Sequence, residues 1–92
     1  MLEKLLENEL ISKHEFREAV IEGIKRVKGI EHVDLANDEN FSNAGLDSLD
    51  AMDLVLQVEA ITGLNFGELN AAEANTIDAF YAKAEALFGN PA

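Results

Sequence analysis

The chain has 92 residues, of which 48% are hydrophobic and none is cysteine, and its formal net charge is −11. This length supports one compact core, the charge disfavours binding to nucleic acid, and the lack of cysteine excludes disulfides, thiolate metal sites and thiol nucleophiles. No apolar run approaches about eighteen residues, and the N-terminus lacks the order of a secretory signal, so we expect a cytoplasmic monomer that inserts into no membrane.

The charge is distributed unevenly along the chain. Six of the seven basic residues lie in the first 28 positions, where six acidic residues balance them. The whole net charge therefore lies in residues 29–92, where Lys83 is the only base. Such a field attracts basic protein surfaces, but solvated acidic faces that keep a small protein in solution are an equal explanation.

The first clear helix is predicted over residues 13–28. Ser12 and Glu15 have the spacing of a capping box, apolar residues then recur at helical spacing, and Gly29 follows as a stop. Upstream, four leucines predict either a short amphipathic helix over 2–10 or a frayed terminus. We therefore expect one domain, with residues 1–11 as an extension and residues 12–89 as the folded bundle.

A long loop is predicted over residues 29–45, because no period survives there and turn-forming residues are frequent. A loop of this length in a small domain is usually pinned by its own apolar residues or serves a function. The expected anchors are Ile30, Val33, Leu35 and Phe41.

Two further main helices and one short helix follow the loop. The second main helix is predicted over 48–62 with Gly63 as its stop, a short helical turn over 71–74, and a last helix from Asn75 or Thr76 to Gly89 and Pro91. No segment alternates apolar and polar residues over the length of a strand. The predicted fold class is all-α, a four-helix bundle of three main helices and one short one. The apolar stripe of the last helix comprises Ile77, Phe80, Tyr81, Ala84, Leu87 and Phe88.

The helix over 48–62 carries two apolar stripes on opposite sides. At about 100° per residue, Leu54, Val58 and Ile61 gather on one side, and Leu49, Met52 and Leu56 on the other. A helix in a domain this small cannot easily bury both sides, so one stripe is predicted to be exposed for docking with partners. The alternative is that the loop or the N-terminal leucines cover the second stripe as ordinary core.

Ser48 stands where the long loop enters this helix, in the segment Gly45-Leu46-Asp47-Ser48-Leu49-Asp50. By geometry alone, a serine at a helix start is explained as an N-cap or first-turn residue. The segment Gly45-x-Asp47-Ser48-Leu49, the acids that follow it, the helix order and the acidity nevertheless resemble the acyl carrier protein family over most of residues 13–88.

The resemblance implies that Ser48 carries 4′-phosphopantetheine, whose thiol holds acyl groups as thioesters. It also implies that a phosphopantetheinyl transferase modifies Ser48, that Asp47 helps this enzyme to place the serine, and that acyl-loading and acyl-processing enzymes dock through basic surfaces. A phosphodiester there would lie at a helix N-terminus, which favours anions. The residues that match the family's recognition positions are Leu49, Asp50, Met52, Asp53, Leu56 and Glu59.

Some positions depart from the family pattern. The segment between Phe41 and Ser48 is one residue short, Ala44 replaces a frequent leucine before Gly45, and Ile61-Thr62 shifts a large apolar residue by one place. These departures, with the N-terminal extension, suggest a specialised carrier that serves a dedicated pathway. The alternatives are a carrier of aminoacyl groups, which the acidity and the Leu46 to Leu49 motif disfavour, and an unmodified acidic interaction module.

Enzymatic and metal-binding functions are not expected. His14 and His32 lie on a helix surface and in a loop, where the sequence places no acid–base or nucleophilic partner beside them. The acids between Asp34 and Glu39 lack the alternating ligands and central glycine of an EF-hand loop. We therefore predict a carrier without catalytic residues and without a metal site.

Overall fold

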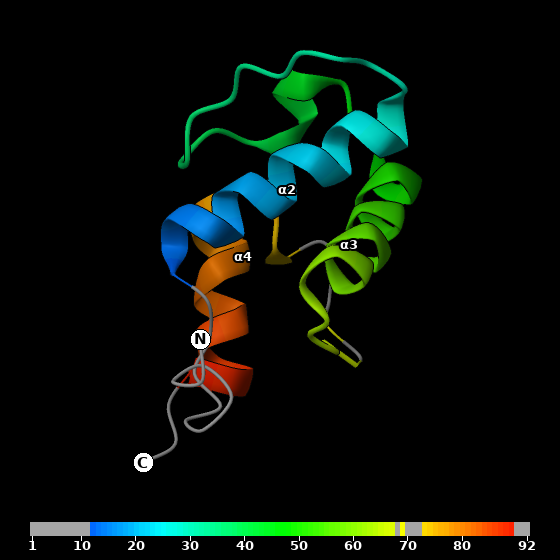
Figure 1. Ribbon diagram of the computed structural model, residues 1–92. Helices are drawn as coiled ribbons and strands as arrows, with labels where there is room; N and C mark the ends of the chain where they lie inside the picture. The colour runs from blue at the N-terminus through cyan, green and yellow to red at the C-terminus, as the bar shows by residue number, and fades with distance from the viewer. Residues whose placement is uncertain (1–11, 68, 70–72, 90–92) are drawn as a thin grey trace.

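The computed structural model describes residues 12–67, 69 and 73–89, and all regular structure in these residues is helical (Figure 1). Helices α2 (Lys13–Lys28), α3 (Ser48–Thr62) and α4 (Ile77–Ala84) are joined by a 3₁₀ turn, η1 (Phe41–Ala44), and followed by a π-helical turn, η3 (Glu85–Gly89). The predicted all-α fold is confirmed. The predicted helix over 2–10 lies outside the described residues, and so do residues 71 and 72 of the short helix predicted over 71–74.

Helix α2 begins and ends where the sequence predicts. The Ser12 side chain accepts the Glu15 N–H, and the Glu15 side chain accepts the Ser12 N–H in return, which completes the capping box. Gly29 closes the helix in the left-handed conformation, with its N–H donated to the Lys25 carbonyl at 2.8 Å. Local hydrogen bonds therefore fix both ends of α2.

The core forms where α2 lies across α3 and α4 (Figure 1). Phe16 of α2 packs edge-to-face against Phe80 of α4, with ring centroids 5.0 Å apart, and Phe66 packs against both rings. Further along α2, Gly23 lets α3 approach closely, since a β-carbon there would lie 2.8 Å from the Leu54 Cδ1 atom. Other core residues that are fully buried include Val20, Ile24, Leu35, Val58 and Ile77.

The long loop is held by buried side chains and by two backbone hydrogen bonds to the segment that opens α4. Leu35 and Phe41 are buried, as predicted, and Val33 is partly buried, but Ile30 is 41% exposed and does not anchor the loop. The Phe41 N–H donates to the Asn75 carbonyl at 2.8 Å, and the Asp78 N–H donates to the Asn37 carbonyl at 2.9 Å. These bonds satisfy backbone groups that have no partner in a helix.

The structure adds η1 to a segment that the sequence predicts as irregular loop. The Asn40 side chain caps this turn by accepting the Ser42 N–H, and Gly45 ends it with φ of +88°. Periodicity does not detect a single turn stabilised by one cap and one buried ring. This turn brings the chain back towards the start of α3.

The last helix begins where predicted and helical structure extends to Gly89 as predicted, but its final turn is not α-helical. Thr76 caps α4 through a hydrogen bond from the Ala79 N–H, but regular α-helix stops at Ala84 and the chain widens into η3. A π turn holds more residues than an α turn, so the side chains after it rotate away from the earlier stripe. Leu87, predicted to pack with Phe80 and Ala84, is accordingly 53% exposed.

No helix in the described part of the chain combines the length and apolar character needed to cross a bilayer.

The close contact at Gly23 is testable. Replacing Gly23 with valine places new atoms against Leu54 and Val58, and overpacking of this kind costs about 1–3 kcal/mol. Glu18→Val, at an exposed position of the same helix, provides the control for the helix propensity of valine. Urea denaturation should show a much larger loss of unfolding free energy for Gly23→Val. Equal losses would contradict the packing role of Gly23.

Candidate attachment site and recognition face

Asp47, rather than Ser48, caps helix α3. The Asp47 Oδ1 atom accepts the Asp50 N–H at 2.9 Å, and the Asp50 Oδ2 atom accepts the Asp47 N–H at 3.1 Å. Ser48 is the first helical residue and is exposed, and its hydroxyl has no hydrogen-bond partner in the described part of the chain. The capping role that would explain a serine here is therefore filled by its neighbour.

The turn that leads to Ser48 is fixed by one glycine and one buried leucine. Gly45 has φ of +88°, a conformation that glycine adopts without strain, and its N–H donates to the Ser42 carbonyl at 3.0 Å. Leu46 is 6% exposed and belongs to the core. Its burial pins the chain two residues before Ser48, while Asp47 and Ser48 stay at the surface.

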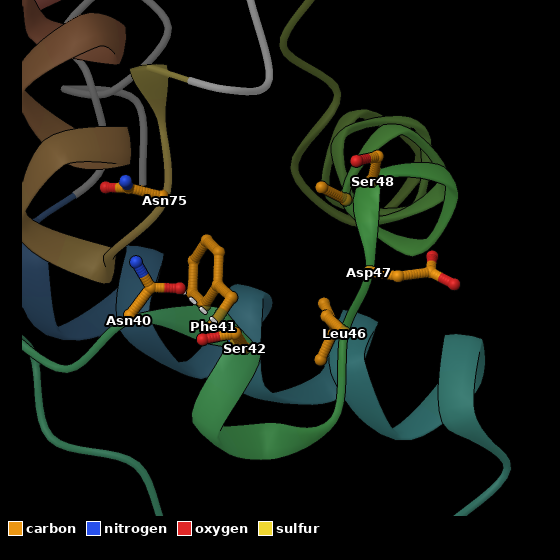
Figure 2. Close-up of a pocket in the computed structure, with 8 residues that line it drawn as sticks. Asn40, Phe41, Ser42, Leu46, Asp47, Ser48 and Asn75 are labelled. Carbon is orange, nitrogen blue, oxygen red and sulfur yellow. Dashed lines mark hydrogen bonds between the residues drawn. The ribbon is translucent and has the colours of Figure 1, made fainter.

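An open groove of about 350 Å³ lies beside Ser48. Figure 2 shows the start of α3 facing the segment around Asn75 across this groove, with Phe41 and Leu46 between them and the Asp47 carboxylate turned away. The complete set of lining residues is Asn40, Phe41, Ser42, Leu46, Asp47, Ser48, Ala51 and Asn75. The Ser48 hydroxyl is thus accessible from the solvent and from the groove.

The surroundings of Ser48 fit a covalently attached phosphodiester. The backbone N–H groups of Ser48 and Leu49 have no acceptor in the described part of the chain, and they lie in the first turn of a fifteen-residue helix. Unpaired N–H groups and the helix dipole favour an anion at this position. They act against the repulsion that the nearby Asp47 and Asp50 carboxylates exert on an anion.

Helix α3 has the two separate faces that the sequence predicts. Leu54 and Val58 are buried at 1% and 0% exposure, whereas Leu49, Met52 and Leu56 are exposed at 72%, 57% and 60%. Cover of this second stripe by the long loop, one form of the alternative, is therefore wrong. The other form involves the N-terminal leucines, which lie outside the described residues. Three large apolar side chains stand together on the outer side of the helix that begins at Ser48.

The acidic side chains around this outer face differ in what they bind. Asp50 forms an ion pair with Lys28 at 3.1 Å, and Glu59 accepts the Phe66 N–H at 2.8 Å, which ties the segment after α3 back to the helix. Asp53 is exposed and has no partner in the described part of the chain. Neither pairing could be predicted from sequence patterns, because Lys28 and Phe66 reach α3 only through the folding of the chain.

The backbone N–H of Asp47, followed by the Lys28 side chain, lowers the pKa of Asp50 below its ordinary value of 3.8. Because the pKa of Asp50 is lower in the folded protein than in the unfolded chain, its ionised carboxylate stabilises the folded state at pH values above the pKa of the unfolded chain. This stabilisation is lost as the pH falls through the pKa of the folded protein.

We therefore expect wild-type protein to be more stable than Asp50→Asn at neutral pH, with the difference shrinking below about pH 4. Urea denaturation of both proteins across this pH range measures the effect. A difference that stays constant from pH 7 to pH 3 would contradict the assigned role of the Asp50 carboxylate.

Comparison with known proteins gives one family and no individual relative. The family model described as "Phosphopantetheine attachment site" matches residues 18–83, which is well over half of the chain. No curated protein and no solved structure matches at a significant level. The matched residues include α2 from Glu18 onward, the long loop, Ser48, α3 and nearly all of α4. The protein therefore belongs to the phosphopantetheine attachment site family, whose domains bind 4′-phosphopantetheine covalently and carry the intermediates linked to it.

Proposed function

We propose that Ser48 is the attachment residue and that the protein carries acyl intermediates as thioesters between biosynthetic enzymes. The observation that carries this proposal is the exposed hydroxyl of Ser48 at the first position of α3, which bonds to no described residue while Asp47 fills the capping role. The groove and the free N–H groups beside the hydroxyl provide space and a favourable potential for the attached phosphate.

The attachment reaction balances with coenzyme A as the donor. The Ser48 Oγ atom forms a bond to the phosphorus next to the pantetheine, the phosphoanhydride bond to the nucleotide breaks, adenosine 3′,5′-bisphosphate leaves, and the hydroxyl proton passes to a base of the transferase. When bound, the prosthetic group supplies the thiol for thioester formation. The chain has no cysteine, so no protein thiol competes for the cargo.

The outer face of α3 is proposed as the surface that the transferase and the acyl-transferring enzymes bind. Leu49, Met52 and Leu56 offer an apolar contact, and the flexible Met side chain suits partners of different shape. Asp53 is the acid best placed to pair with a basic residue of a partner, because its carboxylate is exposed and has no partner among the described residues. Asp50 and Glu59 border the same face and add to its negative potential, although each already holds an internal hydrogen bond.

Acyl cargo is preferred over aminoacyl cargo on the basis of charge and sequence. The net charge of −11 and the segment Leu46-Asp47-Ser48-Leu49 are more typical of fatty-acid and polyketide carriers than of peptidyl carriers. The departures from the common pattern near Ala44 and Ile61 favour a carrier with a dedicated set of enzymes.

Incubation with coenzyme A and a broad-specificity phosphopantetheinyl transferase tests the attachment residue directly. Intact mass spectrometry should show one phosphopantetheine adduct on the wild type and none on Ser48→Ala. Ser42→Ala serves as the control, because Ser42 is an exposed serine that lines the same groove. An unmodified wild type would favour a plain interaction module, and an adduct on Ser48→Ala would place the attachment elsewhere.

The same transferase also probes the recognition face. Asp53→Lys should reduce kcat/KM for modification by about tenfold at low ionic strength, with a smaller effect at high salt, because a charge on a binding surface acts chiefly on association. Asp38→Lys makes the same change of charge at an exposed position of the long loop and should have little effect. Equal losses in the two variants would show that only the overall charge matters.

A further inference from the structure

Lys28 connects the last turn of α2 with the segment that carries Ser48. Its Nζ atom lies 3.1 Å from the Asp50 Oδ2 atom, and the two side chains are only 31% and 22% exposed. The side chain also passes over Gly45, since its Cε atom lies 3.7 Å from the position that a Gly45 β-carbon would occupy. Lys28 therefore pairs with Asp50 after Ser48 and lies close to Gly45 before it.

The ion pair is linked directly to the cap of α3. The Asp50 Oδ2 atom that receives Lys28 also accepts the Asp47 N–H at 3.1 Å, so a single oxygen joins the ammonium group to the residue before Ser48. An ammonium group beside this oxygen fixes the Asp50 side chain in the rotamer that the capping box needs. Two hydrogen bonds thus link Lys28 through Asp50 to Asp47, the residue directly before Ser48 in the chain.

The other bases at this end of α2 do not make such a contact. The Arg26 side chain is directed to Glu22 and Gln57, each at 3.5 Å, and the Lys25 side chain has no ion pair or hydrogen bond in the described part of the chain. The stem of Lys28 packs over the turn while its charged end reaches the carboxylate, which is the usual behaviour of a long amphipathic side chain.

We propose that Lys28 is a positioning residue for modification: it holds the Gly45–Asp50 segment so that the Ser48 hydroxyl is presented to the transferase in one orientation. This role rests on the proposed attachment at Ser48. Positioning of a nucleophile affects the rate of the reaction within the complex more than the binding of the carrier.

The alternative role of Lys28 as a simple charge predicts the opposite result. Removing one positive charge beside the recognition face makes that face more acidic, so a transferase with a basic surface would bind the carrier more tightly and KM would fall. Loss of positioning instead lowers kcat. The direction of the change therefore distinguishes the two roles.

The test compares phosphopantetheine transfer to wild-type protein, Lys28→Met, Lys28→Arg and the control Lys25→Met, all checked for folding by circular dichroism. Lys28→Met keeps most of the apolar stem and removes the charge. We expect its kcat to fall by about twofold to fivefold, the range that a partly exposed ion pair supplies, without an increase in KM. Lys28→Arg should restore most of the rate, and Lys25→Met should match wild type.

Two further measurements make the result specific. Lys28→Met should have no further effect on kcat in an Asp50→Asn background, because the ion pair is already absent there. In the unmodified protein, amide hydrogen exchange at Asp47 should be about twofold to fivefold faster in Lys28→Met than in Lys25→Met.

An unchanged or higher kcat in Lys28→Met, or an equal loss in Lys25→Met, would overturn the proposal. So would an additive loss in the double variant. If wild-type Ser48 takes no adduct, the proposed function itself fails, and the Asp47 exchange rates still decide whether Lys28 holds the segment. If the wild type is modified but Lys28→Met shows unchanged transfer kinetics and unchanged amide exchange at Asp47, only the inference about Lys28 fails.

Discussion

The close packing of α2 on α3 at Gly23 is the constraint on which the rest of this structure depends. Without a β-carbon at Gly23, the Leu54 side chain reaches the backbone of α2, and Val58 is buried beside it. This contact uses one side of α3 for the core and turns the opposite side, with Leu49 and Met52, towards solvent. The exposed apolar face of α3 is thus a direct result of how the core is packed.

The same contact determines which charges remain available around Ser48. It brings the end of α2 beside the start of α3, so Lys28 pairs with Asp50, while the segment after α3 folds back and donates its Phe66 N–H to Glu59. Asp53 is left without an internal partner in the described residues. Acids that are equivalent in the sequence therefore differ in their surroundings, because internal bonds hold the Asp50 and Glu59 carboxylates and no described residue pairs with Asp53.

Much of the fold could be predicted from local signals. The bounds of α2 and α3 follow from side-chain caps at Ser12 and Asp47 and from glycines that end each helix, since these groups act within a few residues of one another. The errors lie where local signals are weak. The exposure of Ile30, the 3₁₀ turn at Phe41 and the widened turn after Ala84 each depend on contacts or backbone shifts that no period in the sequence reports.

The sequence by itself determined the helical class, the ends of two helices, the position of Ser48 at the start of α3 and the presence of two apolar stripes, because capping and periodicity are properties of neighbouring residues. Only the tertiary structure decided which stripe is exposed, that Asp53 has no partner among the described residues and that Lys28 pairs with Asp50. These features join residues more than twenty positions apart, or depend on what covers a surface. Their cause is the packing of one helix on another, which local sequence does not encode.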